Sequence, residues 1–148
     1  MPGADERDRQ ANRQAARFQK VRDAHQTELA EDYVELIADL IEENGEARVV
    51  DLAQRLGVSS ATVNNTISRL QRDGLVTSKP YRSIFLTGQG QEMASASRDR
   101  HQTVRDFLIA LGVNADVAEA DAEGIEHHVS DATLSAFRAY LQRLRPTR

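Results

Sequence analysis

The sequence predicts a mainly α-helical protein with a small β wing, in which an N-terminal winged helix-turn-helix precedes an all-helical domain. Residues 31–43 carry apolar side chains at the i, i+3, i+4 and i+7 spacing of one helix face. Residues 49–73 contain two helical stretches joined by a tight turn at Gly57, which is the pattern of a helix-turn-helix. The expected segments are a polar extension at 1–28, the winged helix at 29–90 and the helical domain at 91–148.

Composition and charge limit the classes of protein to consider. The chain has 148 residues, 28% charged and 40% apolar, and no cysteine, which excludes disulfides and thiolate metal sites. No apolar run approaches the roughly 20 residues that span a bilayer, so we expect a cytoplasmic protein. The net charge of −4 is unevenly spread, because residues 46–90 hold six basic and three acidic side chains while residues 101–131 hold one arginine and seven acids. A basic half and an acidic half indicate two tasks in one chain.

The N-terminal extension is polar and rich in Arg, Gln, Asp and Ala, without dense apolar periodicity before Phe18 and Val21. We expect about its first dozen residues to be disordered and the rest to form a loose helix. The next helix should end at Asn44-Gly45, a typical helix stop. On that helix, Glu35 lies almost opposite the apolar face, where nothing in its own domain would bury it.

The second helix of the helix-turn-helix should begin at Ser59, a favoured capping residue, and end at Gly74. After it, two short strands at 75–77 and 84–87 flank the polar connection 78–83. A hairpin in this place is the wing of a winged helix.

An exposed recognition helix with basic neighbours predicts binding to double-stranded operator DNA. Asparagine can bond adenine edges, and basic residues on both helix and wing can bind phosphates. The predicted DNA-binding residues are Ser59, Ser60, Thr62, Asn64 and Asn65 in the first half of the helix, and Arg69, Arg72, Lys79 and Arg82 beside them. The alternative is a winged helix that serves only as a protein-binding scaffold.

The second domain should contain a long helix at 91–110, after Gly88 and Gly90, and two shorter helices capped by Asn114 and Ser130. His101 lies at the margin of the apolar side of the long helix, where it could be a packed residue or a ligand. A unit this small buries little apolar surface by itself, so we expect it to pair with a second copy as a homodimer.

The stretch Asp-Ala-Glu-Gly-Ile-Glu-His-His, which begins at Asp121, is a candidate cation site. If it is helical, Glu123, Glu126 and His127 gather on one side while apolar residues including Ile125 face the other. Carboxylate and imidazole donors without sulfur suit manganese or iron(II). The alternative is a solvated acidic surface.

The winged helix and this acidic motif together resemble the diphtheria toxin repressor family of metal-dependent transcription regulators. The resemblance covers residues from about 29 to 145. It is carried by five separate blocks: Glu31-Asp32-Tyr33-Val34-Glu35, Gly45-Glu46-Ala47-Arg48, residues 53–58, Arg100-His101 and Glu123-Gly124-Ile125-Glu126-His127-His128. By resemblance, six residues hold a two-ion cluster with bridging carboxylates: Asp32, Glu35, His101, Glu123, Glu126 and His127.

The resemblance also implies the metal and the partners. The iron-responsive branch has a methionine in place of Asp32 and a cysteine in place of Glu123, so oxygen donors here imply the manganese branch, with Mn²⁺ as the cofactor. We expect a homodimer that binds an operator and represses manganese uptake genes, without a membrane or a small organic substrate as partner. The alternatives are a transcription regulator that senses Fe²⁺ or another divalent ion, a winged-helix regulator that responds to a non-metal inducer, and a metal-dependent hydrolase. The hydrolase is disfavoured because the chain lacks an HExxH pair and a phosphate loop.

Overall fold

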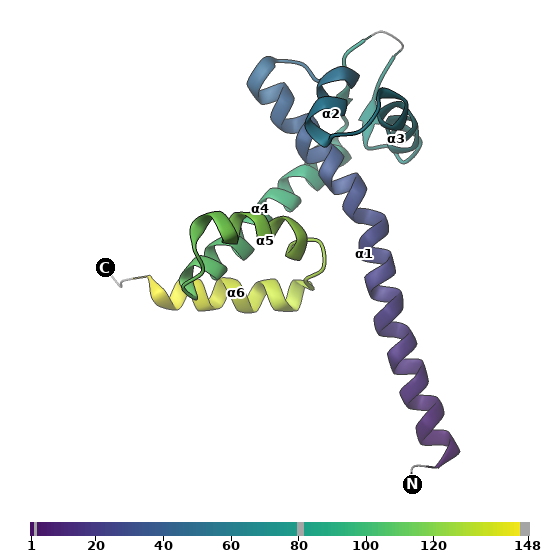
Figure 1. Ribbon diagram of the computed structural model, residues 1–148, viewed down its shortest axis with the longest axis vertical. Coiled ribbons are helices and arrows are strands. Elements are labelled where there is room, and N and C mark those ends of the chain that lie inside the picture. The colour runs from purple at the N-terminus through teal and green to yellow at the C-terminus, as the bar shows by residue number, and fades with distance from the viewer. Residues whose placement is uncertain (2, 80–81, 146–148) are drawn as a thin grey trace.

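The computed structural model describes residues 1, 3–79 and 82–145, and within them it has six helices and one two-stranded antiparallel sheet (Figure 1). The elements are α1 (Ala4–Asn44), α2 (Val49–Leu56), α3 (Ser60–Arg72), β1 (Val76–Thr77), β2 (Phe85–Leu86), α4 (Gly88–Ala110), α5 (Ala115–Ile125) and α6 (Asp131–Leu144). The predicted fold class is confirmed. Residues 80 and 81 of the predicted wing connection lie outside the described residues, as do residues 2 and 146–148. Among the residues described, no helix has the length and apolar character needed to cross a membrane.

Helix α1 is far longer than the helix expected at 31–43. Its 41 residues extend over about 60 Å, and its N-terminal half projects away from the rest of the protein (Figure 1). The structure thus has a helix where we expected disorder. No glycine or proline interrupts residues 4–44, and Ala, Arg, Gln and Glu are strong helix formers. Neighbouring turns also pair their side chains, since Gln19 donates to Asp23 over 2.8 Å and an Arg9 nitrogen lies 3.1 Å from Glu6.

The first core belongs to the winged helix. The C-terminal part of α1 packs against α2, α3 and the wing, and its buried side chains are Tyr33, Val34, Ile37 and Leu40. The predicted turn and cap are confirmed, because Gly57 is left-handed at φ 68° and the Ser59 hydroxyl accepts a hydrogen bond from the Thr62 amide over 3.1 Å. The turn and the cap determine where α2 ends and where α3 begins.

The wing is a short antiparallel pair in which Val76 faces Leu86. A third segment joins it, because the Ile84 amide donates to the Ala47 carbonyl over 2.8 Å. The predicted hairpin is confirmed with strands of two residues each, and it is held against the chain that connects α1 to α2.

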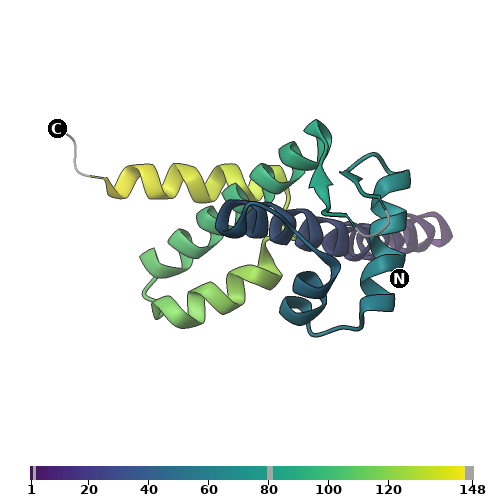
Figure 2. The ribbon, with the colours of Figure 1, turned by 90° about the horizontal axis from the view of Figure 1, so that it is seen from above.

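Helix α4 joins the two cores. It begins at Gly88, three residues before the predicted start at 91, because the Thr87 hydroxyl caps it by accepting from the Gly90 amide over 3.1 Å. Its first turns pack Ala94 into the winged-helix core, and its later turns place Val104 in a second, smaller core with α5 and α6. Figures 1 and 2 show α3 and the helical domain on different sides of α1.

The two shorter helices begin where the sequence predicts. The Asn114 side chain accepts from the Asp116 amide over 3.0 Å, and the Ser130 hydroxyl accepts from the Thr133 amide over 3.2 Å. Both predicted caps are confirmed.

Gly90 allows a close approach between α4 and the wing. A Cβ atom at this position would lie 2.1 Å from the Leu75 carbonyl oxygen. We expect Gly90→Ala to lower the free energy of unfolding by about 1–3 kcal/mol, because the backbone must shift to relieve the overlap. Urea unfolding measures this. Gly88→Ala is the matched control, since a Cβ atom there meets nothing within 4 Å, and an equal effect at both positions would contradict the explanation.

Candidate metal centre

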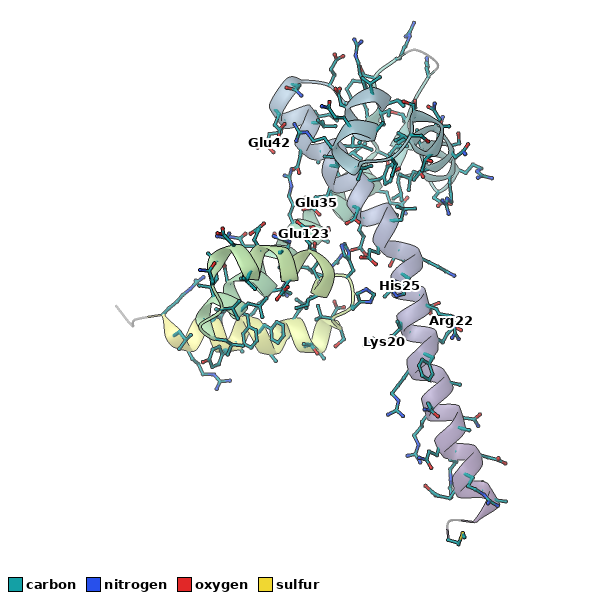
Figure 3. All side chains as sticks on the ribbon, viewed as in Figure 1. Lys20, Arg22, His25, Glu35, Glu42 and Glu123 are labelled. Carbon is teal, nitrogen blue, oxygen red and sulfur yellow. The ribbon has the colours of Figure 1, made fainter. Side chains whose placement is uncertain are left out.

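The six predicted ligand residues come from three elements that meet where α1 passes the helical domain. Asp32 and Glu35 lie on α1, His101 lies on α4, and the other three lie on α5 and the turn that follows it. Figure 3 shows Glu35 on α1 beside Glu123 on α5. The structure therefore brings all six side chains to one joint between the winged helix and the helical domain.

Glu126 lies at the middle of this joint. Its Oε1 atom is 3.4 Å from His101 Nδ1 and 3.6 Å from His127 Nε2. His101 Nδ1 is also 3.6 Å from Glu123 Oε1, and His127 Nε2 is 3.1 Å from Asp32 Oδ1. Donor atoms that share one divalent ion, bound at about 2.0–2.2 Å, lie roughly 3–3.6 Å apart. The spacing of these donors fits metal binding.

Several buried donors at this joint lack hydrogen-bond partners. Within the described residues this holds for both carboxylate oxygens of Glu126, for His101 Nδ1 and for His127 Nε2. The whole Glu126 residue is only 1% exposed. An unpartnered buried carboxylate is costly, and a bound cation would satisfy it. The residues present therefore fit a divalent metal.

Burial and mutual repulsion alter the protonation of the acids. Burial raises the pKa of Glu126 to about 7, the charge of Glu35 adds to this rise, and the two histidines oppose it. Burial also raises the pKa of Glu35, and the Ser97 hydroxyl that donates to it over 2.9 Å only partly offsets this. Burial lowers the pKa of His127, but Asp32 and Glu31 outweigh it and raise that pKa to about 10. The joint thus favours positive charge.

The predicted placement of the acidic motif on one helix face needs correction. Helix α5 ends at Ile125, so Glu126 is its C-cap and His127 lies in the following turn. Ile125, expected on the apolar side, is 36% exposed, whereas Glu126 continues the buried i+4 stripe of Ala118 and Ala122. Glu123 therefore lies on the exposed side of α5, whereas Glu126 and His127 are buried.

Sequence reasoning did not identify the second carboxylate beside each histidine. His127 Nδ1 lies 2.8 Å from Glu31, and His101 Nε2 lies 2.7 Å from Glu119. Each acid also contacts an arginine: Arg100 for Glu31, and Arg105, at 3.0 Å, for Glu119. Such outer carboxylates orient imidazole rings. Their partners are distant in sequence, so no local pattern could reveal them.

The nine predicted DNA-binding residues are all exposed. A surface hollow between α3 and the wing brings Asn64, Lys79 and Arg82 together. The other predicted residues lie on α3 or at its start but do not line this hollow, and the Ser59 hydroxyl is used in capping. The hollow is also lined by four polar residues that sequence reasoning did not assign to DNA: Arg48, Ser68, Gln71 and Ser78.

Comparison with known proteins identifies the family. The description "Iron dependent repressor, N-terminal DNA binding domain" matches residues 25–84, and "Iron dependent repressor, metal binding and dimerisation domain" matches residues 87–146. The transcriptional regulator MntR of Escherichia coli O6:H1 is 55% identical over 126 residues, which cover 85% of this chain and 81% of the relative. The chain belongs to the iron-dependent repressor family. The family resemblance seen in the sequence is confirmed, and because the family consists of transcriptional regulators, the protein is a regulator and not a hydrolase.

More distant relatives support the same family assignment. The HTH-type transcriptional regulator MntR of Bacillus subtilis strain 168 is 39% identical over 100 residues, which cover 68% of this chain and 70% of the relative. A solved manganese-dependent transcriptional repressor in complex with manganese matches with a TM-score of 0.70 and 33% identity, over 76% of this chain and 52% of that one. The manganese regulator SloR matches with a TM-score of 0.67 and 29% identity, over 76% and 53%. This chain spans about half the length of those two solved chains.

The buried, unpartnered Glu126 carboxylate should destabilise the metal-free protein. Because its pKa rises from 4.5 to about 7 on folding, stability is lost as the pH rises through this window. We expect Glu126→Gln to raise the free energy of unfolding by about 1–3 kcal/mol at pH 8, and by much less at pH 4.5, where the acid is neutral in the folded state. Urea unfolding in EDTA at both pH values measures this.

Glu123→Gln is the control, because the Glu123 side chain is 60% exposed. A destabilised Glu126→Gln protein at pH 8, or an equal gain in the control, would contradict the role of burial.

Proposed function

We propose that this regulator is a manganese-responsive repressor in which metal binding couples the helical domain to the winged helix. One observation carries the proposal: Asp32 and Glu35 of α1 face the unpartnered donors of His101, Glu126 and His127 across the joint between the domains. The relatives named for manganese or as manganese regulators support the choice of metal.

The proposed ligands are Asp32, Glu35, His101, Glu123, Glu126 and His127. The distances favour two groups of donors, with Asp32 and His127 in one and His101 and Glu123 in the other. Glu126 lies between them, at 3.4 Å from one imidazole and 3.6 Å from the other. A carboxylate in such a position can bridge two ions, which supports a two-ion cluster in each subunit.

The chemistry of the donors supports manganese. Four carboxylates and two imidazoles form a set without sulfur, and such hard donors suit Mn²⁺. Fe²⁺ tolerates similar ligands and is the alternative, but sulfur donors at positions 32 and 123 would favour it more strongly.

Repulsion among the acids suggests how the two domains are coupled. Asp32 and Glu35 move with the winged helix, while Glu123, Glu126 and His127 move with the helical domain. A bound divalent ion supplies positive charge that neutralises these carboxylates. The residues of both domains are then held together, which restricts the orientation of α3 relative to the helical domain.

The partners proposed are operator DNA and a second copy of the chain. Exposed apolar side chains of the helical domain, such as Leu111 and Val117, at 57% and 51% exposure, could be covered by a partner subunit. In a dimer, metal binding would hold two α3 helices near the spacing of one DNA turn, about 34–36 Å. We expect such a regulator to act in the cytoplasm.

Manganese-dependent operator binding tests the proposal. Fluorescence anisotropy with DNA from upstream of the gene and of nearby transporter genes should show binding that is about 5–150-fold tighter in Mn²⁺ than in EDTA, as expected for a coupling of about 1–3 kcal/mol. Glu126→Gln should lose this response while remaining folded. Asp116→Asn, an exposed change in the first turn of α5, is the control and should keep it. Equal affinity with manganese and with chelator would exclude the proposed function.

The hollow beside α3 predicts which basic residues bind phosphates. We expect Arg82→Ala to weaken binding similarly for all sequences and to reduce the slope of log affinity against log salt by about 1, because one phosphate contact is lost. Arg55→Ala is the control, since Arg55 pairs with Glu43 outside this hollow. An unchanged salt slope for Arg82→Ala would remove it from the interface.

A further inference from the structure

A second cluster of metal-binding side chains lies one helical turn N-terminal to the proposed centre. It contains His25 and Glu28 on α1 and His128 in the turn after α5, and one donor atom from each lies within 4.8 Å of the others. None of the three belongs to the six proposed ligands, but Glu28 adjoins them, because its carboxylate also lies within 4.8 Å of donor atoms of Asp32 and His127. Their i, i+3 spacing brings His25 and Glu28 to one face of α1. Figure 3 shows His25 on the side of α1 nearer the helical domain and Arg22 on the other side.

The distances in this cluster suit a shared ion better than direct hydrogen bonds. His25 Nδ1 and His128 Nε2 lie 3.4 Å and 3.5 Å from the same oxygen, Oε2 of Glu28. Protein N–H···O hydrogen bonds usually measure about 2.7–3.2 Å. Donors arranged tetrahedrally around one ion, at about 2.0–2.2 Å from it, are roughly 3.3–3.6 Å apart. Each of the two imidazole nitrogens has this spacing from Glu28 Oε2.

The cluster is accessible from solvent, and one further acidic residue lies beside it. The three side chains line one surface hollow, together with Asp121 and Gly124 of α5. The two imidazole rings meet edge to face, with centroids 4.9 Å apart and an interplanar angle of 69°. The His25 and His128 side chains are 64% and 32% exposed, so an ion can reach them from solvent, and Asp121 would attract a cation.

We propose that His25, Glu28 and His128 form a further divalent-metal site, separate from the manganese centre, that takes a nitrogen-preferring ion such as Zn²⁺ or Co²⁺. Two imidazole nitrogens and one carboxylate oxygen form a softer donor set than the four carboxylates and two imidazoles of the manganese centre. Three protein ligands leave one position for water. The ion would fasten the N-terminal part of α1 to the turn that carries His127.

Cobalt binding to the full-length chain tests this site. Co²⁺ is added to the wild type and to His25→Ala, and bound ions are counted by equilibrium dialysis while the visible absorption of the cobalt is recorded. We expect His25→Ala to bind one Co²⁺ fewer per chain, or to bind it at least about tenfold more weakly, since even the loss of an outer-shell partner costs about 10–100-fold in metal affinity. His128→Ala should show the same loss. Gln26→Ala, an exposed change beside His25, should bind like the wild type.

Equal stoichiometry, affinity and absorption for His25→Ala and the wild type would overturn the proposal. Loss of manganese-dependent DNA binding in His25→Ala would also overturn it, because His25 would then belong to the regulatory centre. The proposed function and the proposed second metal site can be refuted separately. A wild type whose DNA binding ignores manganese refutes the proposed function, whereas the difference in cobalt binding between wild type and His25→Ala still decides the existence of this site.

Discussion

The buried carboxylate of Glu126, between the imidazoles of His101 and His127, is the constraint on which the joint between the domains depends. Its two oxygens lack hydrogen-bond partners among the described residues, and the nearest positive charge comes from histidines that also have carboxylates beside them. A group buried in this way stores an electrostatic cost in the folded protein. The cost falls only when positive charge enters the joint, so the same residue explains both a strained metal-free state and a strong response to a cation.

The outer carboxylates extend this arrangement into both domains. Glu31 connects His127 to Arg100, and Glu119 connects His101 to Arg105. Each imidazole is therefore held by an acid that is itself held by an arginine. A change in the position of α1 alters the first chain of contacts directly, because Glu31 lies on α1 while His127 and Arg100 do not. The contacts of Glu31 with His127 and Arg100 thus provide a physical path for coupling between the domains.

Features determined by neighbouring residues could be predicted, whereas those determined by distant residues could not. Ser59, Asn114 and Ser130 cap helices through amides two or three residues away, so their roles are visible in the sequence. The types of side chain at the centre were also visible, but the burial of Glu126 depends on the packing of α5 against α4. The extension was misjudged because a composition rich in Ala, Arg and Gln suits both a disordered tail and a solvated helix. The start of α4 depends on a cap at Thr87 that the neighbouring glycines obscured.

The continuity of α1 makes it a lever arm. One uninterrupted helix carries residues of the first core, the side chains that face the helical domain, and a free N-terminal arm. From His25, which still contacts His128, to Ala4 the arm measures about 32 Å, so a tilt of about 5° would displace its tip by roughly 3 Å. A small rearrangement at the joint would therefore produce a larger displacement at the N-terminal end of the helix. The arm is therefore a suitable place for a distance probe, and a molecule bound to the arm would be displaced when the joint rearranges.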